Sequence, residues 1–145
     1  MNNQVHSEAS LVSSNLPGVV TTIAPAVGRL LISTLFILAG LSKIAAPAMT
    51  IGYIQSVGLP MPTVAFGLAA FTEIVGGLML LLGYRTRIVA GVLVIFSLAT
   101  AAFFHNHLGD QNQFIHFFKN VALAGGLLHV MAFGGGRLSL DGRRG

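Results

Sequence analysis

Glu73 is a lone carboxylate within an apolar stretch of about twenty residues, Thr63 to Leu82. It lies about ten residues, or roughly 15 Å at the rise of an α-helix, from the start of that stretch. A carboxylate at such a depth in lipid costs on the order of 3 kcal/mol or more, so it must face other helices and find a cation or a proton. A group of this kind could polarise a bound ligand or relay protons.

Two cations are the expected partners of Glu73. Arg29 lies about 9 Å from one end of its apolar stretch and Lys119 about 7.5 Å from the opposite end of another, so both long side chains could reach towards the carboxylate. Two interpretations stay open: a structural ion network that fixes helix register, and a polar pocket for a redox headgroup or a proton relay. Buried ion pairs stabilise poorly compared with apolar replacements, which favours the functional interpretation.

Histidines form a second group with chemical potential. His105 ends one apolar stretch and His116 begins the next. At 100° per residue His116 and Lys119 share a helical face, with Asn120 beside it, so a pocket opening towards that membrane surface is expected. The unperturbed pKa of an imidazole is about 6.5, and His105 could therefore exchange protons with a reduced ligand.

Metal binding is the alternative use of these histidines. His105, His107, Asp110 and His116 fall close together in the sequence and could hold zinc or copper. However, His-x-His spacing does not place two rings on one helical face, and no His-Glu-x-x-His motif is present. The absence of cysteine also excludes thiolate sites, disulfides and a dithiol relay. We therefore expect no metal ligands.

The elements that position these groups are expected to be membrane helices. The chain is 54% hydrophobic and 8% charged, against about 25% charged residues in a soluble domain. Four apolar spans are each close to the roughly 20 residues that cross a hydrocarbon core. The sequence therefore predicts an all-α membrane protein, a four-helix bundle over residues 23–141 preceded by a flexible tail over residues 1–22. The spans are predicted at about 23–41, 63–82, 88–104 and 114–133.

The distribution of basic residues predicts the orientation of the spans. Five arginines fall on the side that carries both termini, whereas only two lysines fall on the opposite side. The positive-inside rule then places both termini in the cytoplasm of a multi-pass protein in a bacterial inner membrane. Apart from the adjacent pair Arg143-Arg144, the cations are spread singly, which is not typical of a nucleic-acid-binding surface. The five arginines are Arg85, Arg87, Arg137, Arg143 and Arg144, and the two lysines on the opposite side are Lys43 and Lys119.

A weak internal repeat supports this arrangement. Gly76-Gly77-Leu78 in the second span recurs as Gly125-Gly126-Leu127 in the fourth. Small residues let membrane helices approach closely, so these glycines are predicted to be packing positions.

Several motifs in order resemble the DoxX family of small membrane proteins, over about residues 25–141. They are Gly28-Arg29-Leu30-Leu31, Ala39-Gly40-Leu41-Ser42-Lys43, Gly58-Leu59-Pro60, Glu73-Ile74-Val75-Gly76-Gly77 with Gly83-Tyr84-Arg85-Thr86-Arg87, Phe103-Phe104-His105, Lys119-Asn120-Val121-Ala122-Leu123-Ala124-Gly125-Gly126, and Gly136-Arg137-Leu138-Ser139-Leu140-Asp141.

The resemblance implies a four-helix membrane protein of a family that is labelled as oxidoreductases. The family is similar to the small subunit of a thiosulfate:quinone oxidoreductase, and this similarity implies a quinone. It also implies a set of recurrent polar positions, through which Lys43 joins the candidate site. Those positions are Arg29, Lys43, Glu73, Arg87, His105, Lys119 and Asn120.

Three functional hypotheses follow. The first is a membrane redox protein that binds a quinone-like, lipophilic ligand between its helices and takes electrons from a partner protein or a bound cofactor. The second is a non-enzymatic anchor or subunit of a redox or detoxification complex. The third is a small proton-coupled transporter, for which a homo-oligomer would be needed to enclose a path. Quinone is the cofactor that these hypotheses imply, and the lipid bilayer is an expected partner. The candidate residues are Glu73, His105 and Lys119 for catalysis, and Arg29, Lys43, His116 and Asn120 for ligand binding.

Overall fold

The structure, a computed structural model, describes residues 2–144, with side chains from residue 18 onward. The described chain is helical, without strands. Its five helices are α1 (Asn2–Ala45), α2 (Pro47–Ser56), α3 (Pro62–Leu82), α4 (Thr86–Phe104) and α5 (Gln111–Phe133).

Four of the helices are long and apolar enough to cross a membrane, which confirms the predicted fold class. The crossing segments are Gly18–Ala45 of α1 and the whole of α3, α4 and α5. The expected tail over residues 1–22 overlaps the start of α1, and its side chains up to residue 17 lie outside the described residues. Its flexibility stays a prediction.

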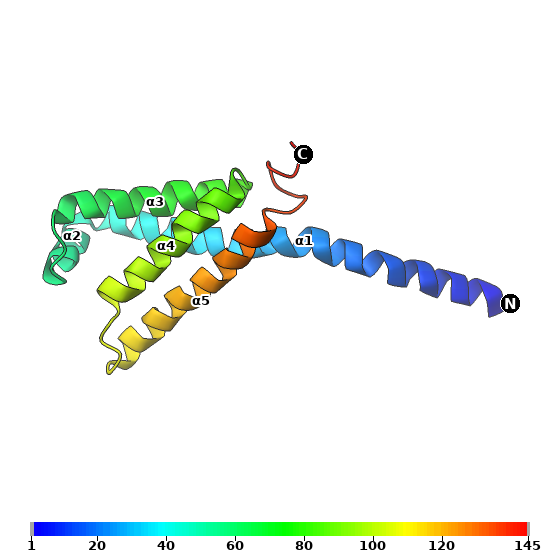
Figure 1. The fold of residues 1–145 in the computed structure, drawn as a ribbon, viewed down its shortest axis with the longest axis horizontal. Helices are drawn as coiled ribbons and strands as arrows, with labels where there is room; N and C mark the ends of the chain where they lie inside the picture. The colour runs from blue at the N-terminus through cyan, green and yellow to red at the C-terminus, as the bar shows by residue number, and fades with distance from the viewer. Residues whose placement is uncertain (1, 145) are drawn as a thin grey trace.

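The four membrane helices form two hairpins. α1 packs mainly against α3, and α4 against α5, with a smaller contact between α3 and α4. Figure 1 shows the α4–α5 hairpin diverging from the α1–α3 hairpin, starting at the turn between α3 and α4. Where the hairpins remain close, their buried side chains form one core; these are Phe36, Leu80, Val89, Ala90, Leu93, Val94, Ala124 and Leu127.

Glycines determine how closely α1 and α3 approach. A Cβ built on Gly77 would lie 2.8 Å from Cγ1 of Ile37, and one on Gly40 would lie 3.1 Å from Cβ of Glu73. Gly77 is therefore a packing position, as predicted. Its counterpart in the repeat, Gly126, is less tightly packed, because a Cβ there would lie 3.4 Å from Cδ1 of Ile32. A Cβ on the preceding Gly125 would meet nothing within 4 Å, so packing against the described chain does not explain that glycine.

The C-terminal segment closes the turn between α3 and α4. The N–H groups of Leu140 and Asp141 donate to the carbonyls of Leu82 and Gly83. The carboxylate of Asp141 accepts from the N–H groups of Arg85 and Thr86 at 2.9 and 2.7 Å, and from the Thr86 hydroxyl at 2.7 Å. These contacts satisfy donors at the start of α4 that the helix itself leaves open. We call this arrangement the C-terminal clasp.

Candidate functional site

A pocket of about 590 Å³ lies between α2, α3 and α4, and also includes Lys43 near the end of α1. The short helix α2 contributes a wall and is joined to α4 by Tyr53, whose hydroxyl donates to the carbonyl of Phe104 at 3.0 Å. The Tyr53 and Phe104 rings also pack together, 5.6 Å between centroids. This volume is within the range of small-molecule sites, roughly 300–1,000 Å³.

An ion pair forms the polar wall of the pocket. Nζ of Lys43 lies 2.8 Å from Oε1 of Glu73. Gly40 makes the contact possible, because its missing side chain lets α1 approach α3 one helical turn before Lys43. Glu73 is only 4% exposed, and its second oxygen, Oε2, is buried without a hydrogen-bond partner among the residues whose side chains are described. The site therefore presents a free acceptor beside a cation.

The expected pairing of Glu73 with Arg29 and Lys119 was wrong. The Arg29 guanidinium instead donates to the carbonyls of Leu80, Leu81 and Leu138, at 3.2, 3.1 and 2.6 Å. Both terminal nitrogens of Arg29 thus bind the end of α3 and the C-terminal clasp, away from the carboxylate, whereas its buried Nε has no partner among the described residues.

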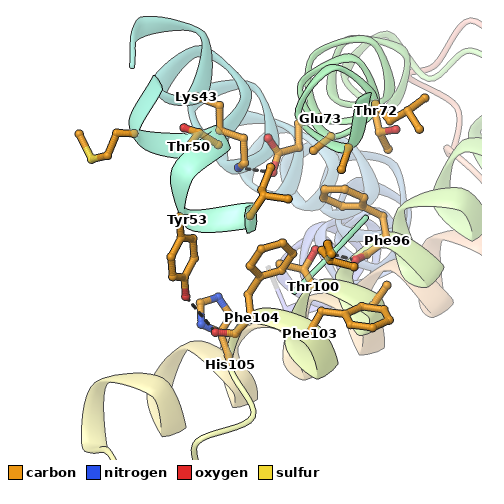
Figure 2. A pocket seen from close by; sticks show the side chains of 17 residues that line it. Lys43, Thr50, Tyr53, Thr72, Glu73, Phe96, Thr100, Phe103, Phe104 and His105 are labelled. Atoms are coloured by element: carbon orange, nitrogen blue, oxygen red, sulfur yellow. Dashed lines mark hydrogen bonds and ion pairs between the residues drawn. The ribbon is translucent and has the colours of Figure 1, made fainter. Parts of the chain in front are cut away.

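His105 lies on the opposite side of the pocket from the ion pair. Figure 2 shows Lys43 and Glu73 pointing towards one another at one side, with His105 and Tyr53 at the other. Nδ1 of His105 lies 2.8 Å from Oε1 of Gln113. A carbonyl oxygen can only accept, so in this arrangement Nδ1 is the donor.

Three of the expected site residues are on α5, outside the lining of this pocket. The ring of His116 stacks on that of His105, with centroids 5.0 Å apart. Nζ of Lys119 lies 3.1 Å from Nδ1 of His116, and the Asn120 amide donates to the backbone carbonyl of His116. The structure therefore joins His116, Lys119 and Asn120 to the pocket only through His105.

The proposed metal ligands do not converge in the described chain. Among the residues whose side chains the structure describes, no three His, Asp or Glu side chains lie close enough together to hold a metal ion. Asp110 instead caps α5, accepting from the N–H of Gln113 at 2.9 Å.

Most of the lining was missed by sequence reasoning because it is apolar. Its aromatic and hydroxyl-bearing members carry no signal that distinguishes them from other membrane-helix residues. They are Tyr53, Thr72, Phe96, Thr100, Phe103 and Phe104.

Comparisons with known proteins extend this description. The DoxX family model matches residues 24–106, which include every residue that lines the pocket. The chain is 33% identical over 122 residues to inner membrane protein YphA of Escherichia coli strain K12, covering 81% of this chain and 87% of that protein. It is 36% identical over 115 residues to inner membrane protein YqjF of the same organism, covering 79% and 87%. No solved structure matches the chain.

Proposed function

The chain belongs to the DoxX family and is a multi-pass inner-membrane protein, and from this premise we propose that its pocket binds a quinone-like, lipophilic ring compound and supports its reduction. Lys43, Glu73 and His105 are the residues that would act on the ligand's oxygens. The proposal narrows the site expected from the sequence to the polar groups that line a single pocket.

The observation that carries the proposal is the free oxygen of Glu73. A buried acceptor without a donor is costly, and buried polar groups in proteins nearly always have a partner. Oε2 of Glu73 would be satisfied by a hydroxyl group of a ligand in the pocket. A quinol has such a hydroxyl, and its oxidised form offers a carbonyl to the neighbouring ammonium group of Lys43.

The rest of the lining supports a flat, apolar ligand. Phe96, Phe103, Phe104 and Tyr53 contribute aromatic surface. Aromatic faces and edges pack favourably on ring compounds, and a ligand of this kind would reach the pocket from the lipid. The few polar groups would then fix its orientation, as is usual in ligand sites.

In the proposed reduction, residues of this chain would supply protons and a partner protein would supply electrons. A quinone becomes a quinol by gaining two electrons and two protons, as its two carbonyls become hydroxyls. Lys43 would stabilise negative charge that develops on one oxygen and pass one proton to it, and His105 would pass the second proton to the oxygen on the opposite side of the pocket. Water at the membrane surface would then return a proton to each of the two residues. The electrons would come from a partner redox protein in the membrane or at its surface, because a chain without cysteine has no dithiol to supply them.

Orientation is part of the same proposal. The excess of arginines at the end that carries the α3–α4 turn and the C-terminus favours a cytoplasmic location for that end. The pocket, which lies beside α2 and the end of α4, would then open towards the periplasmic side.

A direct test uses the chain's lack of tryptophan. Phe104→Trp places a single fluorophore in the pocket wall, and a short-chain ubiquinone analogue should quench its emission saturably in lipid nanodiscs. Leu128→Trp, on the exposed face of α5, is the control and should show only unsaturable quenching. Lipid extracts of the purified wild-type chain should also contain quinone. The proposal fails if no quinone co-purifies and the two tryptophan variants quench alike.

A further inference from the structure

A second pocket, of about 650 Å³, lies at the other end of the molecule, between the α3–α4 turn and the segment that follows α5. It shares none of its lining residues with the first pocket. The function proposed above makes no use of it.

Three arginines line this second pocket: Arg85, Arg87 and Arg137. All three are exposed, and none forms an ion pair within the part of the chain whose side chains are described. Arginine offers a planar fork of donors that matches the oxygens of a phosphate. The guanidinium groups therefore remain available to an anion.

One carboxylate, that of Asp141, also lines the pocket, but its oxygens are already occupied. They accept three hydrogen bonds from Arg85 and Thr86 at the start of α4. Three positive groups thus face a single negative one that is committed to the helix end. The pocket retains an excess of positive charge.

Glycines leave part of the lining of this second pocket without side chains. Gly134 and Gly136 have φ values of 82° and 74°, in the left-handed region that residues with a side chain rarely adopt. A Cβ on Gly134 would lie 3.4 Å from Nε of Arg87, so this arginine lies directly against the glycine turn. The guanidinium is held beside an open stretch of backbone.

An apolar rim distinguishes this pocket from a site for a soluble anion. Ile88 and Phe133 line it and are 63% and 74% exposed. Both belong to helices that are long and apolar enough to cross a membrane, so in a bilayer these exposed side chains would face lipid beside the arginines. A ligand with an anionic head and hydrocarbon chains would meet both surfaces at once.

We propose that this second pocket is a binding site for an anionic phospholipid, whose phosphate contacts Arg87 and Arg137 and whose acyl chains pack against Ile88 and Phe133. Basic pockets of this kind between membrane helices are known to hold anionic headgroups. Bound lipid would link the α3–α4 turn to the end of α5.

The test is lipid retention measured by native mass spectrometry of the full chain released from detergent. Phosphatidylglycerol should be retained over phosphatidylcholine of the same acyl composition. The double variant Arg87→Gln with Arg137→Gln should lower the affinity for phosphatidylglycerol by about tenfold or more. The matched control is Arg143→Gln with Arg144→Gln, which removes the same charge from the same end outside the pocket and should change retention little. Equal losses of phosphatidylglycerol in the two double variants would overturn the proposal, because they would indicate diffuse electrostatic attraction of the lipid to this end of the protein.

Two further arms complete the test. Inorganic phosphate in excess should not displace the lipid, and Phe133→Ala should weaken lipid retention; displacement by phosphate with no effect of Phe133→Ala would indicate a soluble-anion site and overturn the lipid assignment. If the glutamine double variant does not fold, Arg87→Lys with Arg137→Lys keeps the charge but loses the planar fork. It should retain the lipid less well than the wild type, and unchanged retention would again contradict the proposal.

Discussion

Lys43 and Glu73 form an ion pair of 2.8 Å that joins the end of α1 to the middle of α3 in the wall of the pocket. The pair leaves one carboxylate oxygen without a hydrogen-bond partner among the described residues, and under the proposed function this oxygen binds the ligand while the pair also joins two helices. The predictions that follow separate these two roles.

Glu73→Gln tests the carboxylate itself. The amide keeps the size of the side chain but loses the charge that pairs with Lys43, so quenching of Phe104→Trp by the ubiquinone analogue should weaken by about tenfold. Asp110→Asn makes the same chemical change outside the pocket and preserves an N-cap, so it should bind normally. Normal binding in a folded Glu73→Gln protein would favour a purely structural ion pair.

The two lysines distinguish the observed pairing from the one that the sequence suggested. Lys43→Gln should reduce ligand binding, because it removes the cation beside Glu73. Lys119→Gln should have a smaller effect, since its ammonium group contacts His116 outside the pocket lining. Titrations of both variants in the same nanodiscs measure this difference. The reverse order of effects would restore Lys119 as the principal cation of the site.

Arg29→Lys should affect stability more than ligand binding. Lysine lacks the planar fork of donors with which arginine binds the three carbonyls. Each hydrogen bond to a charged group contributes about 1.5–3 kcal/mol to stability. We expect a lower unfolding temperature by circular dichroism, with unchanged quinone affinity in the folded protein. Loss of affinity at normal stability would show that Arg29 belongs to the ligand site.

Asp141 should make stability depend on acid pH. Hydrogen bonds from the Thr86 side chain and backbone, together with the Arg85 N–H, hold the pKa of Asp141 below its ordinary value. These bonds therefore stabilise the folded state above the unfolded pKa of about 3.9, and the stabilisation is lost as the pH falls through the folded pKa.

Asp141→Ala should consequently cost about 1 kcal/mol at neutral pH, the usual contribution of a cap. The difference from the wild type should narrow below about pH 4 in thermal unfolding curves. A difference that stays constant well below that pH would mean that the carboxylate charge does not matter to the clasp.

Two glycines of the repeated motif, Gly77 and Gly125, differ in packing and can be compared. Gly77→Ala should destabilise the protein by about 1–3 kcal/mol, because its Cβ would meet Ile37. Gly125→Ala meets open space, and helix propensity alone would stabilise it by up to about 1 kcal/mol. Unfolding in nanodiscs measures both. Equal destabilisation would show that Gly125 packs against another chain.

The four spans could be predicted because hydropathy is a local property of the sequence. The partner of Glu73 could not, because it depends on how far α1 continues. The helix runs to Ala45 instead of ending near residue 41, which places Lys43 on its last turn. Gly40 then brings that turn against α3. The contact between Asp141 and Thr86 spans 55 residues, and no local pattern indicates it.

The C-terminal clasp has a consequence for biogenesis. Thr86 is synthesised 55 residues before Asp141, and both α4 and α5 lie between them. The start of α4 must therefore remain uncapped by Asp141 until α5 has been synthesised, and the α3–α4 turn becomes fixed only after that. A premature stop codon that removes Asp141 would yield a protein with all four membrane helices but without the hydrogen bonds from Arg85 and Thr86 to Asp141 that hold this turn.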